Sequence, residues 1–199
     1  MSEFWGQFSG VVIGSLFTLA GIWLTNYFSE RKAKKLRKIE ILESFSQIVV
    51  KYAYLLSLVT MAEDERKYCS AVLNLIFDPS EPKTASIKKI FHDEFPRWIS
   101  VLLDAAEKTA EVKSDINKQY TSYKIYFGKD EKLKELLNDF LSASIVTNLS
   151  LYPQNNDQVK IVELHTNNQK LILENIRTIL EPKRKAIVDY LDEKINFLI

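Results

Sequence analysis

Cysteine, glycine and histidine are scarce in this chain of 199 residues, and each shortage narrows the range of possible structures. The single cysteine, Cys69, excludes an intrachain disulfide, which is typical of proteins in a reducing compartment. Of the five glycines, four lie within the first 21 residues and only Gly128 lies beyond them. Residues 39–199 therefore offer few positions for tight hairpin turns or phosphate-binding loops. The shortage of glycine favours an all-α fold.

Familiar catalytic and metal-binding motifs are also missing. The two histidines, His92 and His165, and Cys69 do not have the spacing of a zinc site. The chain contains no Walker-type loop, no GxSxG and no HExxH sequence. Residues 39–199 carry 24 acidic and 21 basic side chains, which gives no electrostatic reason to expect a nucleic-acid partner. We expect no cofactor, metal site or catalytic site, with a pocket built from distant residues as the alternative.

The first 30 residues have the composition of a transmembrane helix. Residues 4–29 carry no charged side chain, and about 20 apolar residues are enough to cross a bilayer. A cleavable signal peptide is not expected, because the basic residues follow the apolar stretch instead of preceding it. A helix lying on the membrane surface would need a polar face, which residues 8–24 lack. We therefore predict a single membrane span.

A basic cluster follows this stretch directly, and we call it the juxtamembrane segment (residues 31–38). Positive charge next to a span is retained on the cytoplasmic side. The sequence thus predicts a single-pass protein of the inner (plasma) membrane, with its N-terminus outside and its C-terminal domain in the cytoplasm. The same side chains can contact anionic lipid headgroups, at about 1 kcal/mol each near the surface, although their role in topology is a sufficient explanation. The cluster consists of Arg31, Lys32, Lys34, Lys35, Arg37 and Lys38.

Small residues in the predicted span recur every three or four positions, which places them on one face of a helix. Such a face allows two helix backbones to approach closely, as in GxxxG helix pairs. We therefore consider homo-oligomerisation, or association with another helix, through this face. The alternative is that glycine is simply common in membrane helices. The residues concerned are Gly6, Gly10, Gly14, Thr18, Gly21 and Thr25.

Beyond the juxtamembrane segment, the pattern predicts long helices. A break is expected at residues 78–82, followed by a short helix from about Ser86 to His92, a new helix from Asp93 to Gly128, and another from Asp130 to Tyr152. The sequence thus predicts a transmembrane anchor (1–30), the juxtamembrane segment, and a cytoplasmic antiparallel bundle of about four to six helices (39–199). The first bundle helix carries a heptad-type, coiled-coil-like seam. The seam consists of Ile41, Phe45, Ile48, Tyr52, Leu55, Val59 and Ala62.

Two polar residues, His165 and Gln169, occupy core-facing positions on an otherwise apolar helix stripe. They either find partners inside the bundle, or the helix has a slightly different phase that exposes them. A sharper hypothesis is a partner-binding or pH-responsive site, since histidine titrates near neutrality.

This layout, a span with a basic flank followed by long helices, resembles that of many uncharacterised bacterial single-pass membrane proteins with a helical cytoplasmic region. The resemblance implies a membrane location and carries over no catalytic residue. We predict a non-catalytic, membrane-anchored interaction, scaffold or regulatory module with a protein partner that the sequence does not identify. The alternative is a membrane-perturbing effector that oligomerises through its span, suggested by the polar residues Gln7, Thr18 and Thr25 on a small-residue face.

Overall fold

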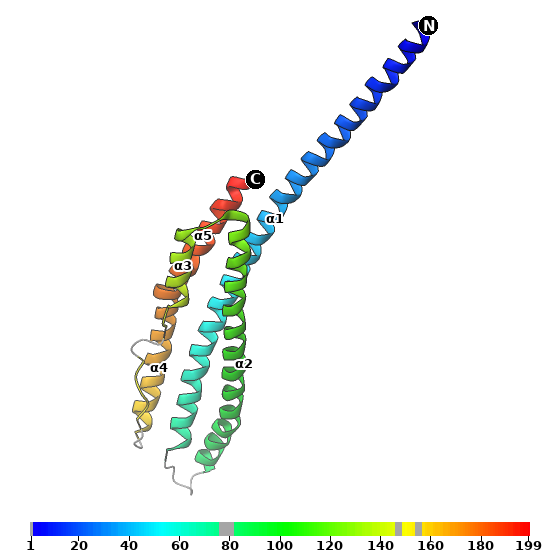
Figure 1. Ribbon diagram of the computed structural model, residues 1–199. Coiled ribbons are helices and arrows are strands. Elements are labelled where there is room, and N and C mark those ends of the chain that lie inside the picture. The colour runs from blue at the N-terminus through cyan, green and yellow to red at the C-terminus, as the bar shows by residue number, and fades with distance from the viewer. Residues whose placement is uncertain (1, 76–81, 146–148, 154–156) are drawn as a thin grey trace.

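The computed structural model describes residues 2–75, 82–145, 149–153 and 157–199, and these contain helices and no strand (Figure 1). Side chains are described within these ranges at residue 18, at 21–75 and from 85 onward. The helices pack side by side into an elongated bundle, from which the N-terminal part of the first helix projects. The elements are α1 (Ser2–Leu73), α2 (Pro82–Phe127), α3 (Glu131–Leu141), α4 (Gln158–Asn175), a π-helical segment η1 (Ile176–Leu180) and α5 (Glu181–Leu198).

Helix α1 is a single helix of 72 residues. It contains no proline, and no glycine beyond Gly21, so that nothing in its sequence breaks the helix before Leu73. At 1.5 Å per residue it is about 110 Å long. Every side chain from residue 21 to residue 37 is exposed, and burial begins at Ile41. Residues 21–37 therefore lie outside the core.

By length and composition, α1 is long and apolar enough to cross a membrane. Within residues 21–73, 39% of its most apolar 18-residue window is buried in the bundle. These properties fit a membrane span and also fit a core helix. The structure thus shows one long apolar N-terminal helix, and a span at residues 1–30 remains a prediction.

The main core forms where α1, α2, α3 and α5 meet. The predicted seam of α1 faces this core, and its members Ile41, Phe45, Tyr52 and Leu55 are buried. Aromatic rings join the helices edge to face, with centroids 6.3 Å apart for Phe45 and Tyr123 and 5.4 Å apart for Tyr52 and Phe140. Further fully buried side chains are Leu42, Val49, Ile116, Leu133, Leu180, Ile187 and Leu191.

Helix α2 begins earlier than the sequence predicted. It starts at Pro82 and passes through Pro96 as one helix, whereas the prediction placed a short helix at residues 86–92 and a separate helix start at Asp93. A proline inside a helix leaves the carbonyl four residues earlier, here that of His92, without its usual partner. His92, Asp93 and Pro96 are all exposed, so water can reach this turn. At its other end, α2 stops at Gly128, as predicted, with a φ of 78° that favours glycine.

The predicted helix from Asp130 to Tyr152 is also wrong in its extent, because α3 ends at Leu141. The described residues beyond α3 are held by tertiary contacts. Ile145 is buried in the core, and its carbonyl accepts a hydrogen bond of 3.2 Å from the side chain of Asn175. The backbone at Ser150 is bonded to the side chain of Asn168. These long-range hydrogen bonds replace those that a continued helix would have made.

Pro182 lies in the first turn of α5, and it does not interrupt the last helical region. The backbone N–H of Glu181 donates to the carbonyl of Ile176, five residues earlier, which is the π-helical pattern. The π-helical segment ends at Leu180, shortly before Pro182, which has no N–H to donate. Helices α4, η1 and α5 follow one another without a gap.

Truncating a core side chain tests this packing. Leu42 is fully buried, so we expect Leu42→Ala to lower the free energy of unfolding by about 2–5 kcal/mol. The control Leu103→Ala removes the same atoms from a side chain that is 65% exposed, and should change stability by less than about 0.5 kcal/mol. Urea unfolding of the detergent-solubilised protein, followed by circular dichroism, measures both. Equal effects of the two variants would contradict the assignment of the core.

Candidate functional site

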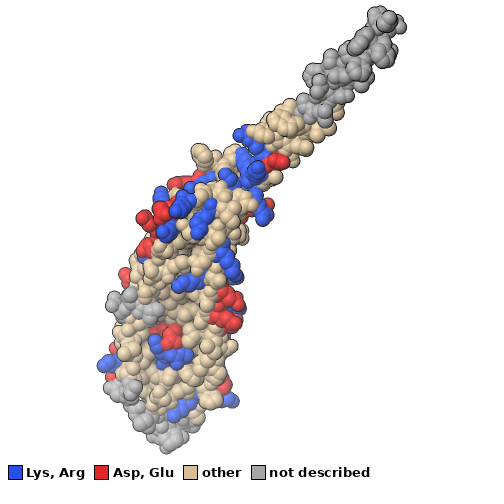
Figure 2. All heavy atoms as spheres, in the orientation of Figure 1, with Lys and Arg blue, Asp and Glu red and all other residues tan. Residues whose placement is uncertain are grey.

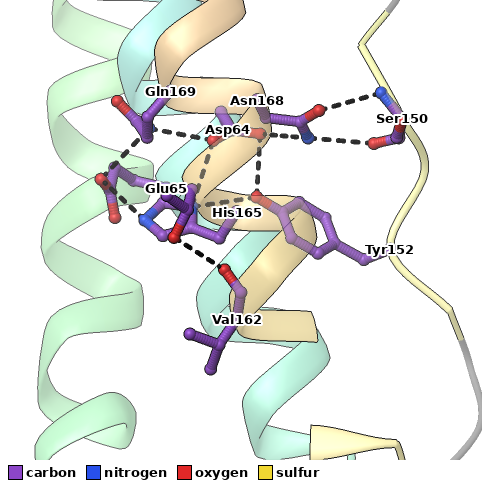
Figure 3. A network of polar contacts seen from close by, with 9 residues as sticks. Asp64, Glu65, Ser150, Tyr152, Val162, His165, Asn168 and Gln169 are labelled. Atoms are coloured by element: carbon purple, nitrogen blue, oxygen red, sulfur yellow. Dashed lines mark hydrogen bonds and ion pairs between the residues drawn. The ribbon is translucent and has the colours of Figure 1, made fainter. Parts of the chain in front are cut away.

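The most concentrated group of polar side chains lies far from the N-terminus, where α1 meets α4, and we call it the Asp64 network (Figure 3). At its centre the carboxylate of Asp64 is buried, with 2% of the residue exposed. The hydroxyl of Tyr152 and the amide of Asn168 each donate to Oδ1 at 3.0 Å. The amide of Gln169 donates to Oδ2 at 2.9 Å. Three segments distant in sequence thus converge on one carboxylate.

His165 occupies the space between two carboxylates of α1. Its Nδ1 lies 3.3 Å from Oδ2 of Asp64, and its Nε2 lies 3.5 Å from Oε1 of Glu65. The imidazole stacks on the ring of Tyr68, with centroids 3.9 Å apart and planes at 7°. Tyr68 in turn packs edge to face against Phe91 of α2. The ring of His165 is therefore held both by polar contacts with two carboxylates and by stacking.

Asn168 connects the Asp64 network to the segment 149–153. Its Oδ1 accepts from the backbone N–H of Ser150, and its Nδ2 donates to the carbonyl of the same residue, both at 3.0 Å. The side-chain amide thus bonds both the N–H and the C=O of Ser150, as the backbone of a neighbouring β-strand would. In the sequence Asn168 stood beside the predicted pair His165 and Gln169, but an asparagine on a helix does not by itself reveal such a backbone partner.

Hydrogen bonds keep the Asp64 carboxylate, at the centre of this network, in its ionised form. Burial alone would raise the pKa of Asp64, but hydrogen bonds from His165, Tyr152, Asn168 and Gln169 outweigh it and hold the pKa below its usual value. For Glu65, burial dominates and raises the pKa. Burial, followed by the negative charge of Asp64, raises the pKa of the Tyr152 hydroxyl. Asp64 is therefore an ionised acceptor at neutral pH.

The Asp64 network is suited to holding helices together. Within the described part of the chain, no buried side-chain nitrogen or oxygen lacks a hydrogen-bond partner. The nearby thiol of Cys69 is buried, which raises its pKa to about 11 and keeps it protonated at neutral pH. An open groove of 680 Å³ lies alongside, but Arg66 and Lys67 at its rim both pair with Glu63. The predicted pair His165 and Gln169 thus finds its partners inside the bundle.

A second carboxylate, that of Asp130, joins three helices at the opposite end of the bundle. It caps α3 by accepting from the backbone N–H of Leu133 at 3.0 Å. The hydroxyls of Tyr123 on α2 and Tyr190 on α5 donate to it, and Lys194 of α5 lies 3.2 Å away. Burial opposes ionisation, but these donors outweigh it and lower the pKa of Asp130 to about 2.

The juxtamembrane segment lies where the projecting part of α1 joins the bundle, and Figure 2 shows lysine and arginine gathered there. The end of α5 reaches the same place, since Nζ of Lys35 donates to the carbonyl of Ile199 at 3.1 Å. Nζ of Lys38 lies 5.3 Å from the ring centre of Phe127, at the end of α2. A groove of 510 Å³ lies between α1 and the end of α5. It is lined by Arg31, Lys32, Lys34, Lys35, Lys38 and Leu198.

The predicted association face is only partly within the described side chains. Gly6, Gly10 and Gly14 lie outside them. Thr18, Gly21 and Thr25 are exposed, and a Cβ added at Gly21 would meet no atom within 4 Å. The hydroxyl of Thr25 bonds back to the carbonyl of Gly21 at 2.8 Å. Between residues 18 and 25, the bundle therefore leaves this face uncovered.

Comparison with known proteins gives no relative from which a function can be transferred. No family model, no curated protein and no solved structure matches the chain.

The lowered pKa values predict that acid weakens the bundle. A carboxyl whose pKa is lower in the folded than in the unfolded chain stabilises the fold above its usual pKa of about 3.9, and the gain is lost as pH falls through the folded value. For Asp130, with a pKa of about 2, the gain is about 2 kcal/mol at neutral pH. We expect Asp130→Asn to lower stability at pH 7 and to flatten its decline between about pH 4 and pH 2.

Urea unfolding of the detergent-solubilised protein at a series of pH values measures this dependence. Asp115→Asn is the matched control, because Asp115 is exposed and pairs only with Lys118, three residues along the same helix. Its acid dependence should match that of the unmodified protein. An unchanged pH profile for Asp130→Asn would show that this carboxylate does not couple the helices.

Proposed function

We propose that this chain is a membrane-anchored, non-catalytic helical module, in which residues 1–30 span the plasma membrane and the bundle of residues 39–199 lies in the cytoplasm. The observation that carries the proposal is the position of the apolar side chains before the juxtamembrane segment. Ile22, Trp23 and Phe28 are 54%, 65% and 62% exposed, on a helix that leaves the bundle. Contiguous exposed apolar surface of this kind marks contact with a membrane or with another protein.

The order of features along α1 supports a span with a fixed orientation. The uncharged residues 4–29 come first, the juxtamembrane segment follows, and the packed core begins only at Ile41. Trp23 and Tyr27 stack with centroids 5.6 Å apart next to Arg31, where an aromatic belt would meet the headgroups. Positive charge directly after the span favours a cytoplasmic bundle and an external N-terminus.

The chemistry of the bundle supports a role in interaction. The two clusters with shifted pKa values, around Asp64 and Asp130, both link helices to one another. Shifted pKa values also occur at catalytic sites, but here hydrogen bonds inside the protein account for them. The span would hold this bundle at the membrane for a cytoplasmic or membrane protein partner.

Charge placed in the apolar stretch tests the span. An arginine at the centre of a spanning helix costs about 2.5–3.5 kcal/mol, so we expect Val12→Arg combined with Leu16→Arg to prevent insertion. The unmodified protein should resist extraction by alkaline carbonate, and a reporter at its C-terminus should be active in the cytoplasm. The control Tyr54→Arg lies on a bundle side chain that is 66% exposed and should leave insertion unchanged. Extraction of the unmodified protein by carbonate would contradict the proposal.

Bulky side chains on the small-residue face test self-association. If two spans pack through this face, Gly10→Ile with Gly14→Ile should separate the backbones and lower the crosslinked dimer fraction in membranes several-fold. The control combines Val12→Ile with Leu16→Ile, which changes apolar residues off this face. An unchanged crosslinking pattern for the glycine variant would show that any oligomer forms elsewhere.

A further inference from the structure

Two apolar side chains at the end of α5 lie outside the bundle core. Phe197 is 92% exposed, and Ile199 is 80% exposed. Between them, Leu198 is partly buried and lines the 510 Å³ groove beside the juxtamembrane segment. An exposed aromatic side chain adjacent in sequence to a residue that lines this basic groove has the composition of a membrane-interface anchor, in which apolar and basic side chains act together.

Two contacts fix this end of α5 next to α1. Nζ of Lys35 donates to the carbonyl of Ile199 at 3.1 Å, and Leu198 packs against the core. One and two turns further into α5, Lys194 and Tyr190 bind Asp130 at 3.2 and 2.9 Å, which ties α5 to the start of α3. The groove therefore has two walls, both anchored to the bundle.

The charge in this groove is largely available to an external anion. Among the described residues, Lys32 and Lys34 have no carboxylate within ion-pairing distance, whereas Arg37 pairs with Glu40 at 3.6 Å. Residues 30–40 contain six basic side chains and two acidic ones, Glu30 and Glu40. The excess of positive charge lies in and around the groove.

The height of the groove above the proposed span matches the headgroup layer. Lys35 follows Ser29, the last residue of the uncharged stretch, by six positions, or about 9 Å along the helix axis. The polar layer on each side of a bilayer is about 5–8 Å thick. Tilt of the helix and the reach of lysine bring its ammonium group into this layer.

We infer that the groove between the juxtamembrane segment and the end of α5 binds the phosphate of an anionic lipid headgroup, with Phe197 inserted at the level of the headgroups. The bundle then lies against the membrane at two points, the span and the end of α5. This inference rests on the proposed function, because it requires the span to bring the groove to the bilayer surface. Lys32 and Lys34 supply the charge, and Leu198 and Phe197 supply the apolar contact.

Depth-dependent fluorescence quenching tests the inference. The full chain with Cys69→Ala and Phe197→Cys is labelled with an environment-sensitive fluorophore and reconstituted into vesicles of phosphatidylcholine and phosphatidylglycerol that contain spin-labelled lipid. We expect quenching at position 197 at least twofold stronger than for a label at Val159→Cys, which is 68% exposed at the start of α4. Equal quenching at the two positions would overturn the inference.

Two further measurements distinguish binding of the charged headgroup from simple proximity to the membrane. Vesicles of phosphatidylcholine alone should give weaker quenching at position 197, and so should Lys32→Gln with Lys34→Gln in the anionic vesicles. The control Lys160→Gln with Lys170→Gln removes two exposed charges from α4 and should leave quenching unchanged. If quenching depends neither on the lipid charge nor on the lysine substitutions, position 197 contacts the membrane without headgroup binding, and the site is refuted.

Carbonate extraction of the same vesicles distinguishes failure of the span from failure of this site. Loss of the protein from the vesicles would reject the proposed span and, with it, the inference. A retained protein without quenching at position 197 would reject only the contact of α5 with the membrane.

Discussion

The uninterrupted course of α1 is the constraint on which the rest of the structure depends. Helix α1 contains no proline, and no glycine beyond Gly21, so the exposed apolar stretch, the basic side chains and the core seam share one helix. Their separations along its axis are fixed by the rise of 1.5 Å per residue. The place of the bundle relative to the basic side chains is therefore set by helix geometry. The other helices pack against the part of α1 that begins at Ile41.

Two carboxylates hold the ends of the bundle, and both do so against the cost of burial. At one end Asp64 draws α4 and the segment 149–153 to α1, and at the other Asp130 draws α2 and α5 to the start of α3. In each case the donors lower the pKa of the acid in spite of burial. Between these ends the contacts are mainly apolar. The ends of the helices are thus fixed by directional bonds, and the middle by packing.

The fold class and the seam of α1 follow from periodicity, because apolar spacing reports which face of a helix is buried. The end of α2 at Gly128 was equally predictable. The length of α3 was not, since it depends on Asn168 and Asn175 bonding to backbone that is distant in sequence. Local propensity carries no information about such partners.

The candidate sites were predictable to different degrees. The basic residues 31–38 stand out in the sequence because they are contiguous. The pattern of α4 did not reveal that Asn168 is buried, and this hid the centre of the Asp64 network. Tyr152 and Asp64 are 88 residues apart, and a single sequence gives no sign that they meet. The contact of α5 with α1 was likewise invisible before the chain was folded.

Because α1 is one continuous helix, its residue count fixes how its two ends are oriented about the helix axis. Each residue of an α-helix turns the chain by about 100°, so the azimuth of the core seam relative to Gly21 and Thr25 is determined by the number of residues between them. A second chain packed on that face would hold its bundle at a defined angle to the first. Rotation of the N-terminal part of α1 about the helix axis would therefore turn the bundle by the same angle.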